Sequence, residues 1–206
     1  MELSESIEAA ALLWAVVDPI GTVPVFIAVT KGHAREDKPK IALRAILISA
    51  GILLFFLVAG QFVLDAMAVP LDAFQVAGGI ILFMFALTMI FGESKPDQEV
   101  ALSRHYKETA VFPLAVPAIA SPGAMMAVVL LTDNHRFSVS NQLVTAMIML
   151  GVLFATYLLL LCAGWIYKKI GDSGASILSR VMGMLLASVA AGNVLEGLKE
   201  YFGVGQ

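Results

Sequence analysis

The sequence has a single cysteine, Cys162, which excludes an intramolecular disulfide and a two-thiol redox relay within the chain. Because Cys162 lies among leucines in an apolar stretch, we expect it to be a small buried hydrophobic residue. The three histidines, His33, His105 and His135, fall in three separate charged segments. No pair has the spacing of a zinc site, so we expect no metal centre.

Sequence motifs of common enzyme classes are also missing. There is no Gly-x-x-x-x-Gly-Lys-Ser/Thr string, so we expect no ATP hydrolysis by this chain. The apolar stretches hold no paired aspartates, no serine with a basic partner and no His-Glu-x-x-His motif, as an intramembrane protease would need. We therefore expect a protein that is not an enzyme, carries no cofactor and binds no nucleic acid.

Charged residues are scarce, at 14%, while 59% of the residues are hydrophobic and the mean hydropathy is +0.88. This composition is typical of an integral membrane protein. A helix needs about 20 apolar residues to cross a bilayer. Uncharged stretches therefore predict an all-α fold of six membrane-spanning helices, at 9–30, 45–64, 73–92, 109–132, 137–167 and 178–199.

The distribution of lysine and arginine predicts the orientation. With both termini on the extracytoplasmic side, only Arg136 and Lys199 would lie outside, so 11 of the 13 basic residues (13 − 2) would lie inside. Trp165 and Tyr167, just before Lys168, fit an aromatic anchor at the inner end of the fifth span. The N-terminus lacks a basic region followed by a short apolar one, so no cleaved signal peptide is expected.

Asp18 is the only charged residue between Glu8 and Lys31. A carboxylate near the bilayer centre costs roughly 2.5–3.5 kcal/mol on insertion scales, so it usually faces the interior of a helix bundle or a wet cavity. Pro19, Gly21 and Pro24 surround it, and such helix breakers are tolerated at that depth where backbone is buried or lines water. These residues indicate that a polar group is handled inside the membrane.

Two short matches indicate an internal repeat. The string starting at Asp18 (Asp-Pro-Ile-Gly) matches the one starting at Ser121 (Ser-Pro-Gly-Ala) at an offset of 103 residues, and Gln75-Val76-Ala77-Gly78 matches Arg180-Val181-Met182-Gly183 at an offset of 105. Two repeats of three spans each must have opposite orientations. We therefore predict one membrane domain made of an inverted repeat, with halves at 1–95 and 109–206 and a cytoplasmic connector at 96–108. The first and fourth helices would both break near mid-membrane.

A broken helix leaves free amides at the start of its second half and free carbonyls at the end of its first half. Amides suit a carboxylate, whereas carbonyls and an acidic side chain suit an ammonium group or a cation. The predicted substrate-binding residues are therefore Asp18, Pro19, Gly21, Thr22, Ser121, Pro122, Gly123 and Asn193, with Asp18 also handling a coupling proton. The alternatives are that Asp18 only caps the broken helix, and that Thr22 bonds back to its own helix.

The small residues Gly78, Gly79, Gly183, Ala187 and Ala191 are interpreted as close-packing positions. Such faces serve packing within one chain as well as a homo-oligomer.

The chain resembles the MarC family, also called the neutral amino acid transporter family, over nearly its whole length. The resemblance is carried by Asp18-Pro19-Ile20-Gly21-Thr22-Val23-Pro24-Val25-Phe26 and by Pro113-Leu114-Ala115-Val116-Pro117-Ala118-Ile119-Ala120-Ser121-Pro122-Gly123-Ala124. Further support comes from Val76-Ala77-Gly78-Gly79-Ile80 and from Arg180-Val181-Met182-Gly183-Met184-Leu185-Leu186. One departure is Ser121, where the family pattern more often has glycine.

The resemblance implies a multi-pass inner-membrane protein in a family where transport of small neutral amino acids is assigned to some members. The leading hypothesis is a proton-linked secondary transporter of alanine-, glycine- or serine-like solutes, working by alternating access around the breaks. The alternatives are an exporter of an inorganic cation or another small solute, and a membrane regulatory subunit that transports nothing.

Overall fold

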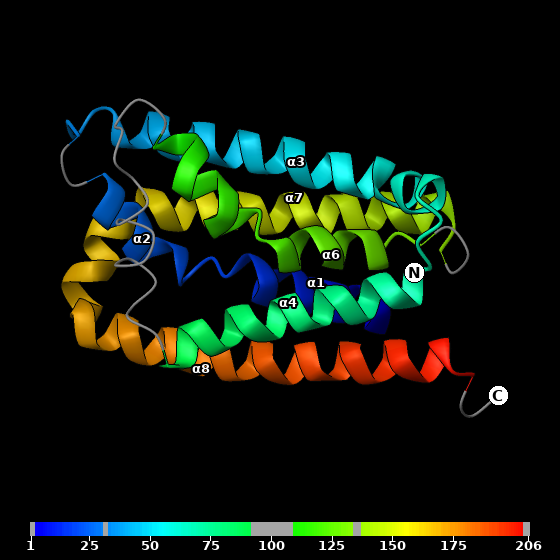
Figure 1. The fold of residues 1–206 in the computed structure, drawn as a ribbon. Coiled ribbons are helices and arrows are strands. Elements are labelled where there is room, and N and C mark those ends of the chain that lie inside the picture. The colour runs from blue at the N-terminus through cyan, green and yellow to red at the C-terminus, as the bar shows by residue number, and fades with distance from the viewer. Residues whose placement is uncertain (1–2, 31–32, 92–108, 134–136, 204–206) are drawn as a thin grey trace.

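The computed structural model describes residues 3–30, 33–91, 109–133 and 137–203, and within these ranges the chain forms helices and turns but no strand. The predicted all-helical fold is therefore confirmed for the described residues. In chain order the helices are α1 (Leu3–Val17), α2 (Thr22–Val29), α3 (Lys38–Ala66), α4 (Leu71–Phe91), the π-helix η2 (Ala110–Ile119), α6 (Pro122–Leu130), α7 (Val139–Leu161) and α8 (Ala163–Tyr201). Both ends of the chain lie at the same end of the bundle (Figure 1).

Four of these helices are long and apolar enough to cross a membrane: α3, α4, α7 and the Arg180–Tyr201 part of α8. Between 22% and 35% of their most apolar windows is buried, so most of each window faces outward. On α3, for example, Val58 and Phe62 are 77% and 74% exposed. Apolar faces of this extent are typical of a surface that contacts lipid.

The broken helices account for the difference between these four spans and the six that the sequence predicts. A fifth span results if η2 and α6, which meet at a bend of 54°, are counted as one. The 15 residues of α1 and the 8 of α2 are each too short to cross a membrane alone. They follow one another along the bundle (Figure 1). The six-span arrangement stays a prediction.

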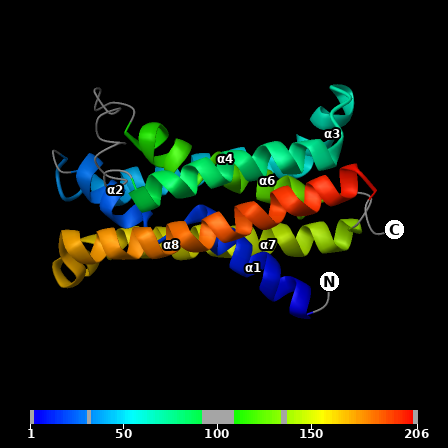
Figure 2. The ribbon, with the colours of Figure 1, turned by 60° about the horizontal axis from the view of Figure 1, so that its bottom comes forward.

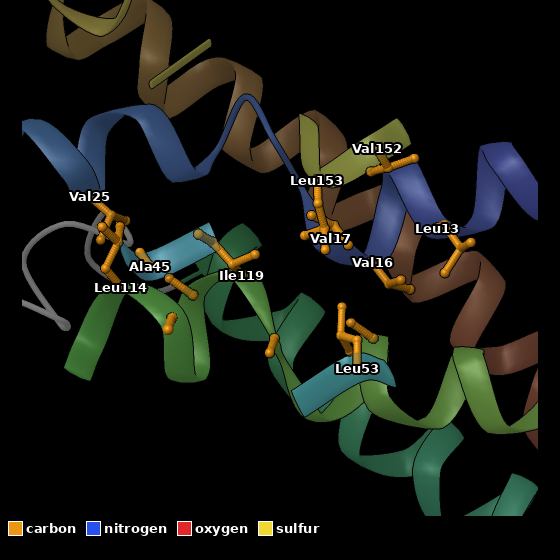
Figure 3. Packing of buried hydrophobic residues seen from close by; sticks show 14 of the residues in the cluster. Leu13, Val16, Val17, Val25, Ala45, Leu53, Leu114, Ile119, Val152 and Leu153 are labelled. Carbon is orange, nitrogen blue, oxygen red and sulfur yellow. The ribbon is translucent and has the colours of Figure 1, made fainter. Parts of the chain in front are cut away.

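The short helices α1, α2 and η2 contribute many side chains to the hydrophobic core (Figure 3). Leu13, Val16 and Val17 of α1 are at most 1% exposed, as is Leu114 of η2. They belong to one cluster with buried residues of α2, α3 and α7, among them Leu53 of α3. In the element packing, α1 contacts α6 and α7, while η2 contacts α2 and α3. The parts of α1 and η2 next to the breaks are therefore buried in the bundle, whereas their outer ends are exposed, as at Ile7 and Val111.

Helices α4 and α8 pack side by side along their length (Figure 2). A Cβ atom added at Gly79 of α4 would lie 2.7 Å from Cγ2 of Val194, and one at Gly183 of α8 would lie 2.9 Å from Cβ of Met89. Because residue numbers rise along one helix as they fall along the other, the two helices are antiparallel. The close-packing interpretation of Gly79 and Gly183 is confirmed, whereas Ala191 is exposed and lies outside this seam.

The end of the fifth predicted span differs from the structure. Helix α7 ends at Leu161, and Cys162, at φ −86° and ψ 1°, lies between α7 and α8. Cys162 is exposed, so the prediction that it is buried is wrong. Helix α8 bends at Gly171 (φ 64°), a backbone conformation that glycine adopts without steric cost. The predicted connector at 96–108 lies outside the described residues.

Candidate functional site

Helix α1 ends one residue before Asp18, and α2 begins at Thr22. The Asp18 amide still donates to the carbonyl oxygen of Trp14 at 3.0 Å, which completes the last turn of α1. Asp18 itself has φ 49°, in the left-handed region where aspartate and asparagine are among the few tolerated non-glycine residues. The predicted break in the first helix is therefore present, and Asp18 is its first residue.

The Asp18 carboxylate is 1% exposed and lies over the start of α2. The Gly21 amide donates to Asp18 Oδ1 at 3.0 Å. A Cβ atom at position 21 would overlap the Asp18 carboxylate, so only glycine permits this close approach. Asp18 therefore caps the start of α2 in this conformation, as the alternative interpretation of this residue predicts.

Thr22 is also buried, at 0% exposure. Its hydroxyl donates to the Asp18 carbonyl oxygen at 2.9 Å, and its amide donates to the same oxygen at 3.0 Å. In this conformation Thr22 bonds back to its own chain segment, as the alternative interpretation anticipated.

The second break follows η2. The helix contains Pro113 and Pro117, both preceded by cis peptide bonds, and the residues before these prolines, Phe112 and Val116, have extended backbone angles. A residue before proline disfavours the α region, which explains why both positions leave the helical path. Ser121, with φ −72° and ψ 157°, then caps α6.

The Ser121 hydroxyl joins the two breaks. It accepts a hydrogen bond from the Ala124 amide at 3.1 Å and donates to the Val16 carbonyl oxygen, also at 3.1 Å. Val16 lies in the last turn of α1, two residues before Asp18, and Ser121 is 1% exposed. A side chain in the second break thus satisfies a carbonyl at the first, which is one of the free groups that a helix end leaves.

The two breaks share a hydrogen-bonding pattern at the same offset. Asp18 Oδ1 accepts from the amide of residue 21, and Ser121 Oγ accepts from the amide of residue 124. The amides of residues 22 and 125 donate to the carbonyl oxygens of Asp18 and Ser121, at 3.0 and 2.9 Å. The helices after the two breaks, α2 and α6, also end alike. Thr30 and Thr132, just beyond them, each donate a side-chain hydrogen bond of 2.6 Å to the carbonyl oxygen four residues earlier.

The other predicted site residues are placed less centrally. Pro122 occupies the first turn of α6 and is exposed, while Gly123 is buried, and a Cβ atom added there would lie 2.5 Å from Cδ1 of Leu82 of α4. Asn193 is half-buried on α8, beside Val194, which packs on α4. Its neighbourhood is thus the packing of α8 on α4.

Sequence reasoning missed a buried polar pair. The Gln61 side-chain amide donates to Asp133 Oδ1 at 2.9 Å, and the two residues are 9% and 3% exposed. In the sequence Asp133 directly follows the fourth predicted span, 109–132, and so marks only where that span ends. The signal that could have revealed the pair was Gln61 itself, an amide within an otherwise apolar stretch.

The two polar side chains at the breaks are closed to solvent in this conformation, since Asp18 and Ser121 are each 1% exposed. A cavity of about 700 Å³ opens at the far end of α2, and its lining includes neither residue. Across the described ranges, no group of three or more histidine, cysteine or acidic residues is arranged to hold a metal ion.

Comparison with known proteins shows what the chain is related to. A match to the family described as "MarC family integral membrane protein" covers residues 3–202. The UPF0056 membrane protein MJ1677 of Methanocaldococcus jannaschii is 30% identical over 97% of this chain and 98% of its own length. YvbG of Bacillus subtilis is 31% identical over 93% of each chain.

The UPF0056 inner membrane protein YhgN of Escherichia coli is 28% identical over 96% of this chain and 98% of its own length. No solved structure matches the chain significantly. The family match spans nearly all the described helices, including both breaks. The chain therefore belongs to the MarC family of integral membrane proteins.

Proposed function

We propose that the chain is a secondary active transporter that carries small neutral amino acids across the inner membrane, linked to a proton, by alternating access around the two breaks. The observation that carries this proposal is the joint between the broken helices. A buried carboxylate begins one break, and Ser121 of the other bonds Val16, two residues away. Discontinuous helices that meet in the bundle centre are a recurrent way for transporters to build a polar site.

The shared hydrogen-bonding pattern supports an inverted repeat of two three-helix halves. The cap at Asp18 and Gly21 corresponds to the one at Ser121 and Ala124 at an offset of 103 residues (18 to 121 and 21 to 124). In the packing, α1 on α7 corresponds to η2 on α3, and α4 is antiparallel to α8, as expected for helices related by an axis in the membrane plane. On this basis α1 and α2 together form the first of six spans.

The placement of both termini on the extracytoplasmic side rests on the positive-inside rule. The structure adds that both chain ends lie at one end of the bundle, as an even number of spans requires (Figure 1). Basic residues gather at the opposite end, where Arg35, Lys38 and Lys168 line one cavity.

The buried joint corresponds in this scheme to an occluded state. The positive end of α2 faces the Asp18 carboxylate, which therefore competes with a substrate carboxylate for the same helix terminus. Protonation of Asp18 would weaken its bond to the Gly21 amide and release that terminus, which links substrate binding to a proton. Pro19 and Pro122 would act through backbone shape, and Thr22 and Gly123 would form the walls of the site when it opens.

One observation favours a second candidate. Because Asp18 already caps α2, its carboxylate also fits a structural role in a membrane subunit that transports nothing. Transport of an inorganic cation would instead use the carboxylate and the carbonyls at the end of α1 as ligands.

Counterflow in proteoliposomes tests the proposal. Vesicles loaded with unlabelled alanine should accumulate external labelled alanine transiently, with glycine and serine competing and glutamate and lysine not competing. Labelled alanine that equilibrates no faster than in protein-free vesicles would contradict the proposal. Accumulation of a divalent cation in place of alanine would favour the cation alternative.

A further inference from the structure

The cavity of about 700 Å³ lies where four helix ends meet, away from the breaks. It is bounded by the end of α2, the start of α3, and the junction of α7 with α8. A volume of this size is in the range of small-molecule sites, which run from about 300 to 1,000 Å³. Its lining combines the basic residues Arg35, Lys38 and Lys168 with apolar residues such as Phe26, Leu161 and Trp165.

The charges in this lining are of one sign. Arg35, Lys38 and Lys168 contribute cationic groups, and among the residues that the structure describes no aspartate or glutamate lines the cavity. Asp37 is close in sequence, but it lies outside the lining and its carboxylate accepts from Lys40 at 3.0 Å. Within the described part of the chain, no carboxylate forms an ion pair with the three cationic lining residues. Three cations around one hollow favour an anion.

Apart from Thr30 and His33, the rest of the wall is mostly apolar, and it reaches the exposed apolar surface of the bundle. Phe26 and Leu160 are buried at the back, whereas Leu161 and Trp165 are 44% and 65% exposed. The Trp165 ring is held from outside by Lys169, whose Nζ lies 4.9 Å from the ring centroid. A tryptophan at a helix end with lysines beside it is typical of the bilayer interface.

We propose that this cavity binds an anionic phospholipid, with the phosphate held by Arg35, Lys38 and Lys168 and the upper acyl chain against Leu161 and Trp165. The apolar wall distinguishes a lipid from free phosphate, because inorganic phosphate has no use for that surface. Basic pockets between membrane helices on the cytoplasmic side commonly bind anionic headgroups. The proposal rests on the cavity alone and stands whether or not the breaks transport amino acids.

Cys162 provides a built-in probe, since it is the only cysteine of the chain, is exposed and lines the cavity. The purified full chain in neutral detergent is reacted with N-ethylmaleimide, and the alkylation rate is measured against added dioctanoyl phosphatidylglycerol, dioctanoyl phosphatidylcholine or sodium phosphate. Phosphatidylglycerol should slow alkylation in a saturable way, and the other two should not. Native mass spectrometry should show phosphatidylglycerol retained on the protein under the same conditions.

A matched pair of variants separates the cavity from general surface charge. In Arg35→Gln/Lys168→Gln both changed residues are exposed, so folding should be kept, and the half-protecting lipid concentration should rise about 25-fold, at about fivefold for each cation. Lys40→Gln/Lys199→Gln removes the same charge outside the cavity and should leave protection unchanged. Equal protection by phosphatidylcholine or by phosphate alone, protection by none of the three, or wild-type protection in the cavity variant would overturn the proposal.

Discussion

Replacing Asp18 by asparagine and by alanine separates a structural role of this residue from a transport role. Asparagine keeps a side-chain oxygen that can accept from the Gly21 amide, and it tolerates the left-handed backbone at φ 49°. Alanine keeps neither property. Only the asparagine variant therefore preserves the cap while removing the charge and the proton site.

The stability difference between the two variants follows from these contacts. Losing the cap costs about 0.5–2 kcal/mol, and placing alanine in the left-handed region costs roughly 1–2 kcal/mol more. Asp18→Ala should therefore be destabilised by about 1.5–4 kcal/mol, taking the two costs together. Asp18→Asn loses only the charge at the helix terminus, which contributes about 1 kcal/mol or less.

Thermal unfolding in detergent and alanine uptake driven by a pH gradient should then respond differently. Asp18→Asn should unfold near the wild-type temperature but lose proton-driven uptake, whereas Asp18→Ala should be less stable and should also lose this uptake. Gly21→Ala is the matched structural control, because its Cβ atom displaces the carboxylate and leaves the charge in place. It should be about as unstable as Asp18→Ala. Wild-type proton-driven uptake in Asp18→Asn would refute a coupling role for the carboxylate, and an Asp18→Asn variant as unstable as Asp18→Ala would refute the capping argument.

Three further substitutions and one control test the hydrogen bonds and the helix packing of the bundle. Ser121→Ala removes the hydrogen bonds to the Val16 carbonyl oxygen and from the Ala124 amide, and it should lower the free energy of unfolding in detergent by about 1–3 kcal/mol. An unchanged value would contradict the claim that Ser121 links the two breaks. Gly183→Ala should lower the free energy of unfolding by about 1–3 kcal/mol, because its Cβ atom would meet α4. The control is Gly192→Ala on the same helix, whose Cβ atom meets nothing within 4 Å; it should be neutral or stabilising by up to about 1 kcal/mol. Equal effects of these two substitutions would contradict the close packing of α8 on α4 at Gly183. Gln61→Leu removes a donor from Asp133 and should cost about 1.5–3 kcal/mol, measured in the same assay, where no loss would show that this bond is dispensable.

The break at Asp18 was predictable because its signals are local. A lone charge in an apolar stretch, with proline and glycine beside it, indicates both the place and the polarity of the site. The same holds for Ser121, since serine followed by proline is a common start of a helix. That Ser121 bonds Val16 could not be predicted, because this contact depends on how two halves of the chain pack.

The errors also have physical reasons. The break between α7 and α8 at Cys162 lies inside a continuous apolar run, and hydropathy gives no signal when one helix ends and another begins without a charge or proline between them. Asp133 was assigned to a span boundary because sequence gives the position of a charge along the chain but not its partner. Its burial against Gln61 depends on the approach of α3 to the end of α6.

Proton movement during alanine uptake is the most direct test of the central claim, that the carboxylate at the joined breaks couples a proton to transport. Proteoliposomes with a trapped pH dye receive external alanine at equal internal and external pH. The wild-type protein should change the internal pH in step with alanine flux, and Asp18→Asn should show neither signal. Alanine accumulation without any pH change, or the same pH change in Asp18→Asn, would contradict the account.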